Sequence, residues 1–163
     1  AELLQVATDI PLVKVLLTFM AILARGASNS HRADFVSGGL LGEAIKAIEI
    51  HASNADLCAE GCLFLAALAR DAPDAVQDAI LGCRVQNRDV IGLMLGMMKR
   101  HSASSNPAAA ARVQSCCAQV LLTLLEKERV RARLQQAPSI QIFAASLECA
   151  IAASKWSIAI CLI

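Results

Sequence analysis

Residues Leu57–Arg70 read LCAEGCLFLAALAR. Apolar and small side chains recur in this segment at the i, i+3, i+4 spacing of an α-helix, at Leu57, Cys58, Gly61, Cys62, Leu65, Leu68 and Ala69. A helix with an apolar stripe this wide needs other elements packed against most of its sides. We therefore expect an inner helix, enclosed by neighbouring helices, to lie at the centre of the fold.

A similar helix ending occurs twice more in the chain. It appears upstream as FMAILAR, which ends at Arg25, and downstream as VLLTLLE, which ends at Glu126. The first two endings are 45 residues apart, and the third follows 56 residues later. The additional residues fall near Arg84–Asn87 and in Ser102–Pro107, where loops are expected. Insertions confined to loops are typical of a helical repeat array.

Capping residues and glycine breaks predict two further helices before each later long helix. A first long helix ends near Ala24, with an inward stripe of Leu12, Val13, Leu16, Leu17, Met20 and Leu23. The candidate N-caps are Thr8 or Asp9, Ser28 or Asn29, Ser53 or Asn54, and Asp71. The expected short, second and long helices cover residues 29–37, 40–51 and 57–70, then 72–82, 88–101 and 107–126, with 127–136 and 140–153 beginning another set.

The spacing divides residues 1–163 into units of one domain. The expected divisions are a partial unit 1–25, complete units 26–70 and 71–126, and a partial unit 127–163. Because the array begins and ends inside a unit, we expect a fragment of a longer array, or else an array with an irregular cap.

The order of a short helix, a glycine, a second helix and a long helix resembles the armadillo repeat, which has roughly 40–47 residues per unit. The segments that carry the resemblance are AIKAIEIHASNADLCAEGCLFLAALA and GLMLGMMKRHSASSNPAAAARVQSCCAQVLLTLL. The resemblance implies an all-α, right-handed α-solenoid of armadillo-like repeats. It also implies a concave groove along the long helices that binds a peptide or a partner domain, so the expected function is that of a protein–protein interaction scaffold or adaptor.

Aligning the helix endings with the family carries ten groove positions over to this chain. They are Lys14, Thr18, Ile22 and Arg25, then Ala59, Leu63 and Ala67, then Ser115, Gln119 and Thr123. The family's groove tryptophan corresponds to Thr18, Leu63 and Gln119, and its groove asparagine to Ile22, Ala67 and Thr123. Because neither residue type is kept, binding of nuclear-import signals is not expected.

Composition and charge argue against several other classes. The chain is 56% hydrophobic and its net charge is +1, with 15 basic and 14 acidic residues, so no overall charge favours nucleic acid or an anionic membrane. An odd number of cysteines, seven, suits reduced thiols in the cytoplasm better than a disulfide framework. The apolar run Ile140–Ile163 is interrupted by Glu148 and Lys155, which favours two buried helices over a membrane span. A nucleic-acid-binding or membrane-associated helical repeat remains the alternative.

The sequence predicts no catalytic residue, metal ligand or cofactor. Cys58 and Cys62 lie one helical turn apart near His51, but a zinc site needs further ligands and core packing is expected instead. The candidate nucleophiles Cys83, Cys116 and Ser115 have no accompanying motif. We expect His51 and His101 to cap the second helices.

Two surface features complete the expectations. The basic run Lys127, Arg129, Arg131 and Arg133 is expected to be a solvated helix face, with contact to an acidic partner or RNA as the alternative, although no aromatic residues accompany it for base stacking. Exposed repeat ends are expected to allow self-association, at Ala1–Val6 and Trp156–Ile163.

Overall fold

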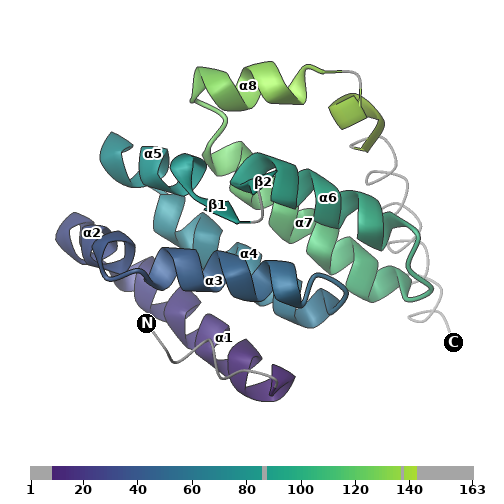
Figure 1. Ribbon diagram of the computed structural model, residues 1–163, viewed down its shortest axis with the longest axis horizontal. Coiled ribbons are helices and arrows are strands. Elements are labelled where there is room, and N and C mark those ends of the chain that lie inside the picture. The colour runs from purple at the N-terminus through teal and green to yellow at the C-terminus, as the bar shows by residue number, and fades with distance from the viewer. Residues whose placement is uncertain (1–8, 86–87, 137, 143–163) are drawn as a thin grey trace, which may run out of the picture.

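The computed structural model describes residues 9–85, 88–136 and 138–142 (Figure 1). The elements are α1 (Ile10–Gly26), α2 (Asn29–Ser37), α3 (Leu40–Ile50), α4 (Ala55–Ala69), α5 (Asp74–Gly82), β1 (Arg84–Val85), β2 (Arg88–Asp89), α6 (Val90–Ser102), α7 (Pro107–Thr123) and α8 (Glu128–Leu134). The described chain is an all-α fold apart from the short antiparallel pair β1–β2, in which Arg84 lies opposite Asp89 and Val85 opposite Arg88. The prediction of an all-α fold is confirmed.

Side-chain caps explain where most of these helices begin. Asp9, Ser28, Asn54, Asp89 and Asn106 each accept a hydrogen bond from the backbone N–H three residues later. The first three belong to the pairs of alternatives named from the sequence. Pro11 and Pro107 stand in the first turns of α1 and α7, where a missing N–H costs no helical hydrogen bond.

Three local predictions are wrong. Asp71 does not cap a helix; it has a left-handed φ of 52°, and α5 begins only after Pro73. Short polar side chains tolerate that backbone region, so Asp71 turns the chain instead. The helix predicted over 107–126 ends at Thr123. The segment near Arg84–Asn87, expected to be a loop, contributes β1 and the β1–β2 pairing.

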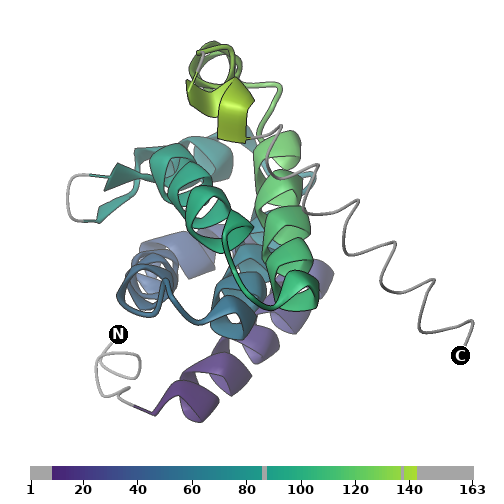
Figure 2. The same cartoon turned by 90° about the vertical axis from the view of Figure 1, so that its right-hand side faces the viewer.

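The helices stack in layers. In Figure 1 the order runs from α1 at the bottom through α3 and α6 to α8 at the top, and Figure 2 shows the same order after a quarter turn. The long helix α4 packs along α1 on one side and along α7 on the other, while α3 covers α4 and α6 covers α7. The same succession of helices, short, second and long, occurs in α2–α3–α4 and in α5–α6–α7.

The core centres on α4, as the sequence predicts. Twelve of its 15 residues are buried, because other helices enclose it on several sides. Phe64 is fully buried and its ring meets Phe35 of α2 edge-on, with ring centroids 5.8 Å apart. Gly61 faces Ile48 of α3 so closely that the two helices approach each other at this point.

The inward stripe predicted for the first helix is only partly right. Val13, Leu17 and Met20 are buried, but Leu12 is 49% and Leu23 is 45% exposed. The helix is apolar on two faces and α4 covers one of them. The other face presents a row of exposed apolar side chains, Leu12, Val15, Phe19, Ile22 and Leu23.

His101 does not cap its own helix as predicted. It is buried, and its Nε2 donates a hydrogen bond of 3.0 Å to the carbonyl oxygen of Ala52 in the turn after α3. The imidazole therefore ties the end of α6 to the end of α3. His51 does stand at the C-cap position of α3.

Several predictions fall beyond the described residues. Among the helices of residues 9–85, 88–136 and 138–142, none has both the length and the apolar character that crossing a membrane requires. Most of the run Ile140–Ile163, and the self-association segments Ala1–Val6 and Trp156–Ile163, lie outside the described part of the chain. The unit boundaries at residues 25, 70 and 126 stay predictions.

Candidate functional site

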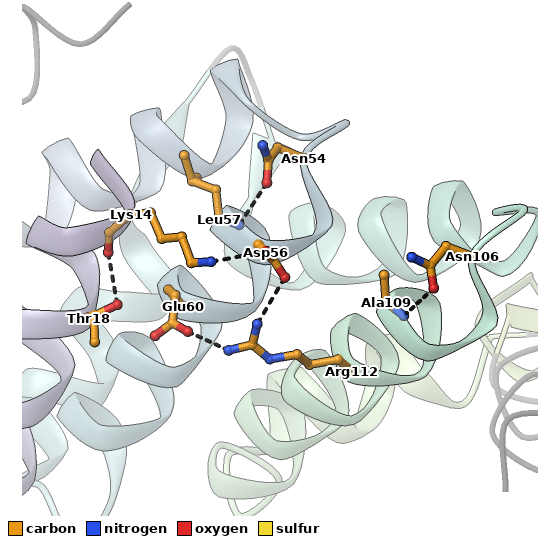
Figure 3. Close-up of polar contacts among 9 residues, drawn as sticks. All are labelled: Lys14, Thr18, Asn54, Asp56, Leu57, Glu60, Asn106, Ala109 and Arg112. Atoms are coloured by element: carbon orange, nitrogen blue, oxygen red, sulfur yellow. Dashed lines mark hydrogen bonds and ion pairs between the residues drawn. The ribbon is translucent and has the colours of Figure 1, made fainter. Parts of the chain in front are cut away.

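The three long helices α1, α4 and α7 present one surface with a network of ion pairs (Figure 3). Asp56 of α4 lies between two cations: its Oδ2 is 3.0 Å from Nζ of Lys14 on α1, and its Oδ1 is 3.0 Å from Nη1 of Arg112 on α7. Arg112 also pairs with Glu60, one turn along α4. Two carboxylates and two cations thus compensate one another and join the three helices.

Two of the predicted groove hydroxyls are committed to their own helices. Thr18 Oγ1 donates to the carbonyl oxygen of Lys14, and Thr123 Oγ1 donates to that of Gln119. This back-bonding to the preceding turn is common for threonine in helices. Each hydroxyl can therefore accept a hydrogen bond from a partner, but its own hydrogen is already donated within the helix.

The hydrogen bond and the charge of Lys14 lower the pKa of Asp56 below its ordinary value, and Arg112 adds to the effect. A carboxyl with a lowered pKa in the folded protein stabilises the fold only while it is ionised. The contribution is therefore complete above the unfolded-state pKa, about 3.9, and is lost as the pH falls through the folded-state value.

Asp56→Asn is expected to lower the free energy of unfolding at neutral pH by roughly 0.2–1 kcal/mol, a small effect because the Asp56 side chain is 53% exposed. The difference between the parent and the variant should shrink as the pH falls from neutral through the lowered pKa of Asp56, to an acidic pH at which the parent carboxyl is also protonated. Denaturant unfolding at both pH values measures this. Asp34, which forms no ion pair within the described residues, supplies the control Asp34→Asn. The prediction would be contradicted if acidification lowered the free energy of unfolding of the parent and of Asp56→Asn by the same amount.

A cavity of about 270 Å³ opens where α1 and α4 end. We call it the arginine pocket; its lining residues are Arg25, Arg32, Leu63, Ala66, Ala67, Arg70 and Gln119. Four of them, Arg25, Leu63, Ala67 and Gln119, are among the predicted groove residues, so the stacking brings these four together.

The arginine pocket is strongly positive. Of the described residues that line it, three are arginines and none is acidic. Arg32 is only 8% exposed; it donates through Nη1 to the carbonyl oxygen of Arg70, while its buried Nε has no hydrogen-bond partner among the described residues. A buried charged donor without a partner is costly, and an anion in the pocket would reduce that cost.

The other predicted groove residues are scattered. Ala59 is wrong as a contact residue, because its side chain is fully buried. Asp56 is exposed and Leu63 is half-buried, whereas Ala59, which lies between them on the same side of α4, has no exposed surface. Ser115 is exposed on α7, and Ile22 belongs to the apolar face of α1.

Sequence reasoning missed Arg32 and Arg70. A signal for Arg70 was present: the repeated endings FMAILAR and LAALAR put Arg25 and Arg70 at equivalent positions of two stacked helices. For Arg32, on α2, no periodic signal exists, because it reaches the pocket from a different layer.

The buried cysteines behave as small core residues. Burial raises the pKa of Cys58 to about 12 and that of Cys116 to about 11, so both thiols are protonated at neutral pH. Cys62 Sγ lies 3.7 Å from Cys117 Sγ and 3.6 Å from Met94 Sδ, in the apolar core. Among the described residues, no three His, Cys, Asp or Glu side chains gather in a way that would hold a metal ion.

Comparison of the chain with protein-family models, with curated proteins and with solved structures found no match. The function of the chain is therefore inferred from its own side chains and their arrangement.

Proposed function

We propose that this chain is a segment of an armadillo-like, right-handed α-solenoid that acts as a protein–protein interaction scaffold. It binds an extended peptide segment of a partner across α1, α4 and α7. The repeated order of short, second and long helices supports the architecture. The arginine pocket is the single observation that carries the function, since it collects predicted groove residues in one recess.

The chemistry of the arginine pocket favours an acidic residue in the bound segment. A carboxylate accepts two parallel hydrogen bonds from one guanidinium, and Arg25 and Arg70 both line the recess. Leu63 and Ala67 supply an apolar floor for the methylene groups of a glutamate. Arg32, whose guanidinium is largely buried, adds a third positive charge to the lining of the recess.

The ion-pair network around Asp56 contributes differently. Its two cations and two carboxylates already pair with one another, so that part of the surface offers little net charge to a ligand. We therefore expect the acidic residue of the partner to bind in the arginine pocket. Uncharged residues of the same partner segment are expected to lie across Lys14 and Asp56.

A peptide-display selection with the whole chain tests this function. We expect the enriched peptides to carry a recurrent aspartate or glutamate. For a synthetic peptide from that set, Arg25→Gln or Arg70→Gln in the protein should weaken binding about tenfold or more, as should replacing the acidic residue of the peptide by its amide. Fluorescence anisotropy of the labelled peptide measures the affinities.

Arg131→Gln, the same change at an exposed arginine of α8 that is not among the residues lining this pocket, is the matched control and should leave the affinity unchanged. Peptides without an acidic preference, or equal binding by the parent protein and Arg25→Gln, would contradict the proposed function.

A further inference from the structure

A second and larger recess lies away from the long-helix surface. It has a volume of about 590 Å³, and its walls come from β1–β2, the first turn of α6, and α8. We call it the hairpin cleft. Its polar lining consists of Arg84, Arg88, Asp89, Arg129, Arg133 and Gln136.

The positive charge of the hairpin cleft is only partly compensated. Within the described part of the chain, Asp89 is the single acidic residue in the lining, and both of its carboxylate oxygens are engaged. Oδ1 accepts the backbone N–H of Gly92 at 2.8 Å, which caps α6, and Oδ2 pairs with Nη2 of Arg129 at 3.1 Å. Asp89 therefore neutralises Arg129, and the described lining of this cleft supplies no counter-charge for Arg84, Arg88 and Arg133. Arg88 also lines a neighbouring cavity together with Glu49.

Those three arginines remain available to a ligand. Within the described residues, the side chains of Arg84 and Arg88 form no hydrogen bond or ion pair, and Arg133 donates only to Oε1 of Gln136, at 3.1 Å. All three side chains are exposed, so a ligand can reach them from solvent.

Three elements carry these arginines to the cleft. The β1–β2 pairing sets Arg84 opposite Asp89. Arg88 lies over α6, since a Cβ built on Gly96 would be 3.8 Å from its Nη1. Arg129 and Arg133 stand four residues apart on α8, and therefore on one face of that helix.

Three guanidinium groups carry three positive charges, which one carboxylate on a ligand would not balance. A phosphate monoester carries about two negative charges at neutral pH and three acceptor oxygens, and arginine is the residue best matched to it. Among the described residues, the lining contains no aromatic side chain on which a nucleobase would stack, which argues against a nucleotide or a single-stranded nucleic acid.

We propose that the hairpin cleft binds a phosphorylated serine or threonine in an exposed segment of a protein partner. The phosphate is held by Arg84, Arg88 and Arg133, while Asp89 keeps Arg129 and the start of α6 in position. This site is independent of the arginine pocket and does not depend on the proposed function of the long-helix surface.

Binding of matched peptides tests the proposal. A labelled glycine- and alanine-rich peptide with one central phosphoserine should bind the chain, and the same peptide with serine should bind at least about tenfold more weakly. Inorganic phosphate should compete, since it shares the recognised group. Arg84→Gln, Arg88→Gln and Arg133→Gln should each weaken phosphopeptide binding about tenfold or more, as measured by fluorescence anisotropy.

Two control variants distinguish binding in the hairpin cleft from general attraction of the phosphopeptide to positive charge. Arg131→Gln removes an arginine of α8 that does not line the cleft, and Arg25→Gln removes one from the arginine pocket. Both should leave phosphopeptide binding unchanged. Circular dichroism and thermal unfolding establish that each variant is folded.

Three results would overturn the proposal: equal affinity for the serine and phosphoserine peptides, equal losses in Arg131→Gln and Arg84→Gln, or single-stranded RNA displacing the phosphopeptide at lower concentration than inorganic phosphate does. Because the long-helix surface is tested with Arg25→Gln and this cleft with Arg84→Gln, failure of one proposal is distinguishable from failure of the other.

Discussion

Phe64→Ala is expected to lower the free energy of unfolding by about 3–5 kcal/mol, the largest effect of any single substitution considered for this chain. Phe64 is fully buried in α4, and its ring meets Phe35 of α2 at an interplanar angle of 62°. Removing the ring loses buried apolar area, leaves a cavity and breaks an edge-to-face aromatic contact.

Denaturant unfolding followed by circular dichroism measures this loss. Phe19→Ala makes the same chemical change at a position that is 56% exposed on α1, and its effect should stay within about 0.5 kcal/mol. Since small domains have a total stability of about 5–15 kcal/mol, Phe64→Ala should leave a much weakened fold. Similar losses for the two variants would show that the core is not centred on α4.

Gly61→Ala is expected to destabilise the protein by about 1–3 kcal/mol, although alanine normally favours a helix over glycine by about 1 kcal/mol. A Cβ at Gly61 would overlap Cγ1 and Cδ1 of Ile48, the latter at 2.5 Å. Ile48 is itself fully buried and β-branched, so it cannot rotate away freely. The helices α3 and α4 would have to separate.

The matched control is Gly42→Ala in α3, where nothing lies within 4 Å of the new Cβ. This variant should keep or slightly raise the stability. A double-mutant cycle adds a second test: in an Ile48→Ala background, the cost of Gly61→Ala should largely disappear, because the overlapping atoms are gone. Additive losses in the cycle would show that contact with Ile48 is not the cause.

The overall charge of +1 gives no indication of the two positive recesses. The 14 acidic residues nearly balance the 15 lysines and arginines in number, but not in position. Lys127 is paired with Asp74 at 2.7 Å and Asp78 at 3.0 Å, while none of the described residues lining the arginine pocket is acidic. Charge counts over a whole chain therefore exclude a uniformly basic protein, but they do not exclude local anion sites.

The basic run Lys127–Arg133 shows the limit of interpreting charge along the chain. It is a helix, as predicted, but its cations have separate roles. Arg131 donates to the carbonyl oxygen of Glu126, whereas Arg129 and Arg133 face a cleft whose other arginines lie more than 40 residues earlier. No pattern within the run indicates that Arg129 and Arg133 share a cleft with arginines from β1 and β2.

The amino-acid sequence by itself determined the helices, most of their capping residues and the burial of α4, because helical periodicity and capping depend on residues within a few positions of one another. The tertiary structure alone decided which apolar face of α1 is covered, why Ala59 is inaccessible, and which arginines share a recess. Periodicity defines the faces of each helix but does not specify which distant element packs against them, and both recesses are formed by such packing.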